Sequence, residues 1–136
     1  MSPYRSNDFR HDCVTDGCLQ DKLPSWEWMR GCFPRAKIMP TDVDGMVEVN
    51  HHFLFIEQKG RLAHLPEPQR QAYKRLAEER NKTVLWLRET EHDDRFEVLI
   101  FSADGPSLGF DTWSIPAIKN WLTDWSAHAE LARGVA

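Results

Sequence analysis

Two short, largely apolar segments near the middle of the chain flank a polar tip. Met46 to Val49 and Phe53 to Ile56 are the two segments, and Asn50-His51-His52 separates them. Apolar runs on either side of a turn-prone tip are typical of a β-hairpin. The pattern therefore predicts two antiparallel strands joined near residue 50.

The hairpin gives the nearby acids positions. If Asn50 and His51 form a two-residue turn, Asp44 stands opposite Glu57 and Asp42 opposite Lys59, about 5 Å apart at Cβ. Because strand side chains alternate between faces, these residues share one face. A four-residue loop would shift the partners but keep the faces, whereas an odd loop would reverse one strand. The other face is apolar and is expected to be core: Val43, Val47, Val49, Leu54 and Ile56.

The later segments alternate between helical and strand periodicity. Pro68 suits the first turn of a helix to about Arg80, and Lys82–Glu89 is typical of a parallel central strand after a crossover helix. Arg95–Ser102 predicts another strand, and Ser114 is expected to cap a final helix. The helix stripes at i, i+3, i+4 and i+7 are Gln69, Ala72, Tyr73, Leu76 in the first and Ile118, Trp121, Leu122, Trp125 in the second.

These elements predict an α/β fold, with a mixed sheet flanked by helices. The 136 residues are 41% apolar, which is enough for one domain with a sizeable core, expected over residues 25–136 after an arm at 1–24. We find no run long enough to cross a membrane and no apolar leader at the N-terminus, so we expect a soluble, cytoplasmic protein without a membrane partner.

The facing acids indicate a divalent cation. Like charges opposite each other destabilise a sheet, and Mg²⁺ or Mn²⁺ between Asp44 and Glu57 would offset that repulsion. Lys59 adds a positive charge, and a metal with a nearby cation is what phosphodiester hydrolysis requires. The alternative is a structural charge cluster. The net charge of −4 argues against a general nucleic-acid binder.

The spacing of Asp44 and Glu57-Gln58-Lys59 resembles the D…(D/E)xK signature of the PD-(D/E)xK nuclease superfamily. Phe33-Pro34-Arg35 and Pro40-Thr41-Asp42-Val43-Asp44-Gly45 are also similar to small nuclease-like proteins of bacteriophages. The resemblance implies a restriction-endonuclease-like αβββαβ core, here with an extra C-terminal helix. Its first strand has room only at Lys37–Met39.

The resemblance also implies roles for individual residues. Asp44 and Glu57 would hold Mg²⁺ or Mn²⁺ with the Gln58 carbonyl, and Lys59 would position the attacking water. Gln69-x-x-x-Tyr73 is similar to the Q-x-x-x-Y element of RecB-like nucleases, which helps to organise the active site and the substrate. This implies a catalytic role for Gln69 and a DNA contact for Tyr73; the alternative is a solvated Gln69 and a core Tyr73. Further candidates are Glu27 and Asp42 for a second metal, and Arg35, Lys37, Arg70 and Lys74 for DNA.

Glu27 falls in a short helix that Ser25 could cap and Gly31 could end, so it could also simply complement the helix dipole. Near the N-terminus, a structural Zn²⁺ could bind one histidine and the three cysteines, although their spacing fits no standard zinc finger. The alternative is reduced thiols in a flexible arm. The zinc candidates are His11, Cys13, Cys18 and Cys32.

The expected function is therefore that of a metal-dependent deoxyribonuclease. The alternative is a non-catalytic protein that keeps the nuclease fold to bind nucleic acid or to block a host defence complex. Cutting both strands with one site per chain would call for a symmetric homodimer.

Overall fold

The structure is a computed structural model that describes residues 26–35, 40, 43–106 and 109–132. The chain divides into two compact units, Met1–Asp42 and Val43–Ala136. This boundary lies later than the one expected after residue 24. The second unit contains every strand of the described residues and the helices α2 and α3.

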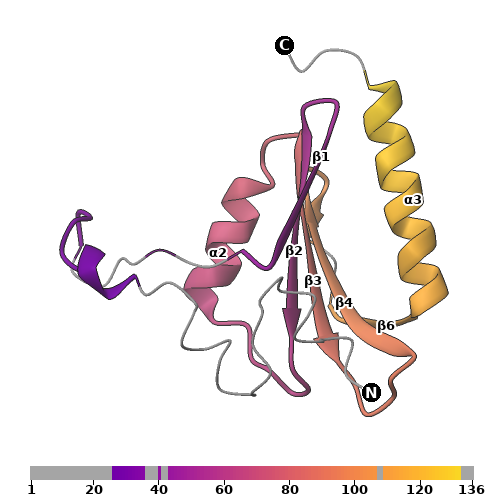
Figure 1. Cartoon of the computed structure of the whole chain (residues 1–136), viewed down its shortest axis with the longest axis horizontal. Helices are drawn as coiled ribbons and strands as arrows, with labels where there is room; N and C mark the ends of the chain where they lie inside the picture. The colour runs from indigo at the N-terminus through magenta and orange to yellow at the C-terminus, as the bar shows by residue number, and fades with distance from the viewer. Residues whose placement is uncertain (1–25, 36–39, 41–42, 107–108, 133–136) are drawn as a thin grey trace, which may run out of the picture. The chain divides into compact units, whose positions relative to one another are not determined.

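A mixed sheet forms the centre of the second unit (Figure 1). Its strands follow the order β1-β2-β3-β4-β5, and β6 pairs with β4 beside β5. Strands β2 and β3 run parallel, and the other pairs are antiparallel. The strands are β1 (Gly45–Val49), β2 (His52–Lys59), β3 (Lys82–Glu89), β4 (Arg95–Ser102), β5 (Gly105–Pro106) and β6 (Asp111–Ser114).

The β1–β2 turn has the predicted length. Asn50 and His51 both have positive φ angles, 50° and 66°, as a two-residue type I′ turn requires. The pairing that follows runs from Val49 with His52 to Gly45 with Ile56. The predicted register of the hairpin is therefore confirmed.

The crossover from β2 to the parallel β3 contains helix α2, Glu67–Leu76. Pro68 lies in its first turn, as predicted, but the helix ends at Leu76 rather than near Arg80. Ala72 is exposed, and Ala77, just past the helix end, is buried instead. The side of α2 that meets the sheet is thus centred on Tyr73.

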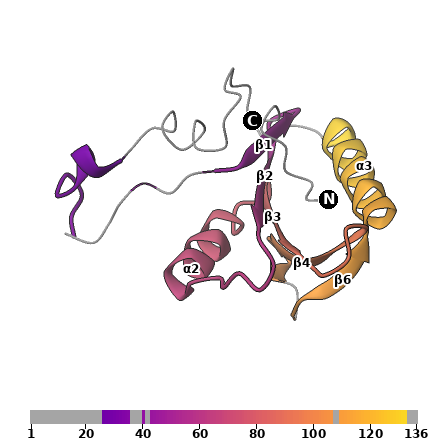
Figure 2. The same ribbon diagram turned by 60° about the horizontal axis from the view of Figure 1, so that its bottom comes forward.

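Each face of the sheet has its own hydrophobic core, and Figures 1 and 2 show α2 and α3 (Ile115–Leu131) on opposite sides of the sheet. Under α2 the core includes Trp86, Phe101 and Tyr73. Under α3 it includes Leu54, Leu85, Leu87, Phe96, Val98 and Ile118. The sequence predicted core on one face of the hairpin only, but Phe55 on the acid-bearing face packs against the α2 core as well.

The mixed α/β architecture, the strand Arg95–Ser102 and the Ser114 cap are confirmed. Ser114 Oγ accepts a hydrogen bond from Ala117 N–H at 3.2 Å, and the tryptophan stripe of α3 packs on the sheet. Strands β5 and β6 were not predicted, and the strand expected at Lys37–Met39 lies outside the described residues. No helix in the described ranges is both long and apolar enough to cross a membrane.

The first unit is described at residues 26–35 and 40. These residues include the 3₁₀ turn η2 (Glu27–Met29), which is followed by Gly31 at φ +85°. Trp26 occupies the N-cap position without a side-chain cap, while the predicted cap, Ser25, lies outside the described residues.

Candidate functional site

Asp44 and Glu57 face each other at the open end of the hairpin. Gly45 pairs with Ile56, so the next step of the ladder sets Asp44 across from Glu57. Asp44 Oδ2 also accepts a hydrogen bond from the backbone N–H of Gln58 at 2.8 Å. Because Glu57 alternates with Phe55, which packs against the α2 core, both acids lie on the α2 face of the sheet.

Glu57 is the one buried charged side chain of the described residues, with 2% of its surface exposed. Its Oε2 atom accepts no hydrogen bond from them. Buried carboxylates nearly always have such partners. The unsatisfied oxygen therefore indicates a position where a ligand would be stabilising.

Lys59 supplies the positive charge of the site. Its Nζ lies 3.4 Å from Glu57 Oε2 and forms an ion pair with this carboxylate. One third of the lysine side chain is exposed, so water screens part of this attraction. Lys59 can consequently meet a molecule that arrives from solvent.

Burial and, to a lesser extent, the negative charge of Asp44 together raise the pKa of the Glu57 carboxyl to about 7, although Lys59 opposes both effects. Desolvation disfavours the charged form of a carboxyl, and a like charge nearby does the same. A shift of this kind in a group beside a specific charge partner is typical of functional sites.

Tyr73 lies behind the two acids. Its side chain is 8% exposed, and its hydroxyl has no hydrogen-bond partner within the described part of the chain. Burial, then the charges of Glu57 and Asp44, raise the pKa of this hydroxyl. The tyrosine was predicted to contact DNA, but its burial suits a place behind the carboxylates better than a place on the binding surface.

The parallel register of β2 and β3 brings two further residues to the site that the sequence did not indicate. Trp86 stands beside Glu57, and Arg88 stands beside Lys59. Trp86 is completely buried, and its Nε1–H lacks an acceptor among the described residues. Residue spacing along the chain carries no signal for these neighbours, because a crossover leaves the parallel register open.

Arg88 fastens the loop after Lys59 to the sheet. Its guanidinium donates to the carboxylate of Glu97 and to the Ala63 carbonyl, the latter at 2.8 Å. The same group lies 4.2 Å from the ring centroid of Phe110, within the range of cation–π attraction. Arg88 thus restrains the segment that connects Lys59 to α2.

Three further candidates, Gln69, Arg70 and Lys74, lie on α2. Gln69 is half-buried, one helical turn before Tyr73, and Arg70 pairs with Glu67 at 3.8 Å. Lys74 lines a small hollow with Phe101 and Ser102 of β4. Strands β2 and β3 lie between that hollow and Asp44, so Lys74 is not brought to the acid pair.

The remaining candidates belong to the first unit, which is described by itself. Glu27 makes two hydrogen bonds with Arg30, at 2.8 and 2.9 Å, and the hydrogen bond and charge of Arg30 lower the pKa of its carboxyl. Arg35 is exposed, as is Cys32, whose thiol is free. Five candidates lie outside the described residues: Lys37, Asp42, His11, Cys13 and Cys18.

Asp44 and Glu57 fit a magnesium or manganese ion. Within the described ranges no cluster of three or more His, Cys, Asp or Glu side chains could hold a metal, so the site offers a pair of carboxylates. Mg²⁺ usually takes one or two protein carboxylates and completes its shell with water and substrate phosphate. The unsatisfied Glu57 oxygen provides one such ligand.

Comparison with known proteins identified no relative. No protein-family model matches the chain, and neither the curated proteins nor the solved structures gave a match.

Proposed function

We propose that this protein is a Mg²⁺- or Mn²⁺-dependent deoxyribonuclease. The observation that supports the proposal best is the convergence of Asp44, Glu57 and Lys59 on one face of the sheet, with Lys59 Nζ 3.4 Å from Glu57 Oε2. Two facing carboxylates with a partly exposed lysine are the set that metal-assisted phosphodiester hydrolysis needs.

Asp44 and Glu57 would hold the ion, and the ion would polarise the scissile phosphate and lower the pKa of a bound water. Asp44 is already fixed by the Gln58 N–H, so its carboxylate keeps one orientation. Lys59 would orient the attacking water and stabilise the negative charge that develops on the phosphate. Gln69 and Tyr73 would support this arrangement from α2.

Cleavage of plasmid and linear DNA in Mg²⁺, in Mn²⁺ and in chelator tests the proposal. Asp44→Asn, Glu57→Gln and Lys59→Met should each lower the rate by about a hundredfold or more, since each removes a metal ligand or the stabilising cation. Glu130→Gln and Lys119→Met on α3 are matched controls, because both side chains are exposed on the other side of the sheet. Full cleavage by any of the three site variants would overturn the assignment.

The second candidate is a non-catalytic protein that keeps the nuclease fold to bind nucleic acid or to block a host defence complex, and the net charge of −4 favours the second of these roles. Phosphate affinity comes mainly from Lys and Arg, so an acidic chain suits a protein partner better than DNA. Under this reading the site variants would leave partner binding intact, and no divalent ion would produce cleavage.

A further inference from the structure

The turn that follows Lys59 puts a leucine where turn geometry favours glycine. Ala63 N–H donates to the Gly60 carbonyl at 3.1 Å and closes a four-residue turn. Leu62, the third residue of this turn, has a φ of +62°. A positive φ at the third position is the mark of a type II turn, where glycine or asparagine avoids the clash of a Cβ with the backbone.

Leu62 gains no burial in return for this strained conformation. Its side chain is 83% exposed, and the neighbouring Arg61 side chain is 59% exposed. A bulky apolar residue normally has a negative φ and a buried side chain, and Leu62 has neither. Such positions concentrate at sites of function, where the side chain meets something outside the fold.

A cavity of about 330 Å³ opens beside Leu62. Lys59, Arg88, Glu97 and Thr112 are successive partners across β2, β3, β4 and β6, so they form one row across the sheet. The last two of these residues line the cavity. It therefore lies along the row that begins with Lys59, near the carboxyl ends of the two parallel strands, where α/β sheets commonly bind ligands.

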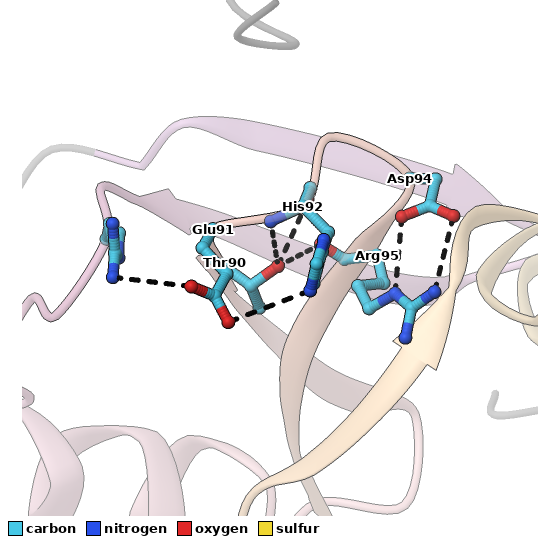
Figure 3. A network of polar contacts seen from close by, with 6 residues as sticks. Thr90, Glu91, His92, Asp94 and Arg95 are labelled. Carbon is cyan, nitrogen blue, oxygen red and sulfur yellow. Dashed lines mark hydrogen bonds and ion pairs between the residues drawn. The ribbon is translucent and has the colours of Figure 1, made fainter.

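The charges around the cavity are already paired. Figure 3 shows Glu91 beside His92 and Asp94 beside Arg95 on the β3–β4 connection. Glu91 Oε2 lies 3.9 Å from Arg61 Nη2, and Glu91 Oε1 lies 3.7 Å from His92 Nε2. Arg95 Nε lies 3.2 Å from Asp94 Oδ1. Three glutamate carboxylates line the cavity against two arginine guanidinium groups, so it suits an uncharged group with polar edges rather than a phosphate.

We propose that Leu62 and this cavity receive a nucleobase of the DNA strand next to the phosphodiester that is cut. This rests on the proposed function, because Lys59, three residues earlier, would place the scissile phosphate. Leucine serves as an apolar wedge against bases in other DNA-binding proteins. The cavity volume is at the small end of the range for ligand pockets, about 300–1,000 Å³, which suits one planar base.

Within this arrangement Leu62 contacts the face of the base, and Thr112 and Glu97 meet its polar edge. Carboxylate and hydroxyl oxygens accept hydrogen bonds from exocyclic amino groups. The expected preference is therefore for a base with an exocyclic amino group, namely cytosine, adenine or guanine, over thymine beside the cut.

Two substitutions separate strain from binding. Leu62→Gly should raise the melting temperature by a few degrees, because it relieves the positive φ. The same variant should bind a short oligodeoxycytidylate in Ca²⁺ about fivefold or more weakly, the loss expected for one stacked base. Its affinity for an abasic chain of the same length and charge should not change. Leu131→Ala is the matched control, since Leu131 is also 83% exposed but lies at the end of α3.

The outcomes distinguish this proposal from the assignment as a nuclease. If the parent protein cuts no DNA in Mg²⁺ or Mn²⁺, the proposed function fails, and the binding measurement still decides the role of Leu62. If Leu62→Gly binds both chains as the parent does, the base contact is wrong and the turn serves another partner, such as a protein. A lower melting temperature for Leu62→Gly would overturn the strain argument.

Discussion

Glu57 is the described carboxyl group whose charged form is disfavoured by burial in the folded protein. Burial and the Asp44 carboxylate both raise its pKa, and the ion pair with Lys59, at 3.4 Å, does not compensate for them. In the absence of a bound cation the carboxyl consequently holds a proton up to about pH 7. The folded protein accepts this arrangement although a glutamine of the same shape would avoid it, as expected when a residue is selected for function rather than stability.

Glu57→Gln should make the metal-free protein more stable at alkaline pH. The folded pKa, about 7, lies above the ordinary value of 4.5 for a glutamate carboxyl, so between these values the folded state binds more protons than the unfolded state. Stability from this group is then highest at low pH and falls as the pH rises through the window, by about 3 kcal/mol in total. Urea unfolding in chelator from about pH 5 to pH 8 measures this.

Glu130→Gln provides the control, because Glu130 is exposed on α3. It should keep the decline in stability that the parent shows, whereas Glu57→Gln should lose it. Parallel pH profiles for the parent and Glu57→Gln would contradict the buried, proton-binding state of Glu57.

Neighbouring substitutions should move the pKa of Glu57 in opposite directions. Asp44→Asn removes a negative charge that raises it and should lower it, while Lys59→Met removes a positive charge that lowers it and should raise it. Carbon-13 NMR titration of the side-chain carboxyl follows the group directly. Shifts of the same sign in both variants would contradict the geometry of the site.

The sequence predicted the acid pair of the hairpin but not the residues of β3 that lie beside it. Asp44 and Glu57 could be paired because a two-residue turn fixes an antiparallel register over a short distance. Trp86 and Arg88 could not be paired with Glu57 and Lys59, since the crossover through α2 allows many parallel registers. Leu62 was also missed, because an exposed leucine in a loop becomes informative only when its φ angle is known.

At the scale of elements, the tip of the β1–β2 hairpin is tied to the end of α3. Asn50 Nδ2 donates to the carbonyls of Ala129 at 3.0 Å and Ala132 at 2.7 Å. The last carbonyls of a helix have no partners within the helix, so this side chain caps α3 from a distant part of the chain. The contact fixes the hairpin that carries Asp44 and Glu57 against the helix on the other face.

Asn50→Ala should therefore destabilise the protein by about 2–4 kcal/mol. It removes two hydrogen bonds of about 1 kcal/mol each, and alanine tolerates a φ of 50° less well than asparagine, which adds up to about 2 kcal/mol. Asn50→Gly removes the bonds but tolerates the φ angle, so its loss should be smaller. Guanidinium unfolding of both variants, with the exposed Asn120→Ala as control, checks this order; an equal loss in both would show that backbone strain contributes nothing.

Other elements illustrate what local sequence determines. The strand Arg95–Ser102 agrees with its alternating pattern, because Phe96 and Val98 face the α3 core while Leu99 and Phe101 face the α2 core. Helix α3 agrees with its periodicity because it packs one apolar stripe on the sheet. Helix α2 is shorter than its pattern predicted, and Ala77, just past its end, is buried in the core in place of Ala72. Strands β5 and β6 were missed because Gly105–Pro106 and Asp111–Ser114 are too short to establish alternation.

At the scale of the whole molecule, the negative charge limits how DNA could be held. The net charge is −4, and Lys74, one of the predicted contacts, lines a hollow beside β4 rather than the acid pair. Few phosphate contacts imply a shallow dependence of binding on salt. The ion at the acid pair would then contribute a large part of the attraction, so DNA binding should depend more on divalent ions than on ionic strength.

Binding of that ion should also be visible in stability, and more so at high pH. A ligand that binds only the folded state stabilises it by mass action, about 2.7 kcal/mol at a concentration of 100 times Kd. Because Glu57 must lose its proton to bind the ion, and its pKa is about 7, protons compete below neutrality. The rise in melting temperature with Mg²⁺ or Mn²⁺ should therefore be larger near pH 8 than near pH 6.

Asp44→Asn and Glu57→Gln should lose this rise, and Glu130→Gln should retain it. A melting temperature that is indifferent to both ions at either pH would contradict the metal site and leave the two acids as a structural charge cluster, because an ion that binds the folded state must stabilise it.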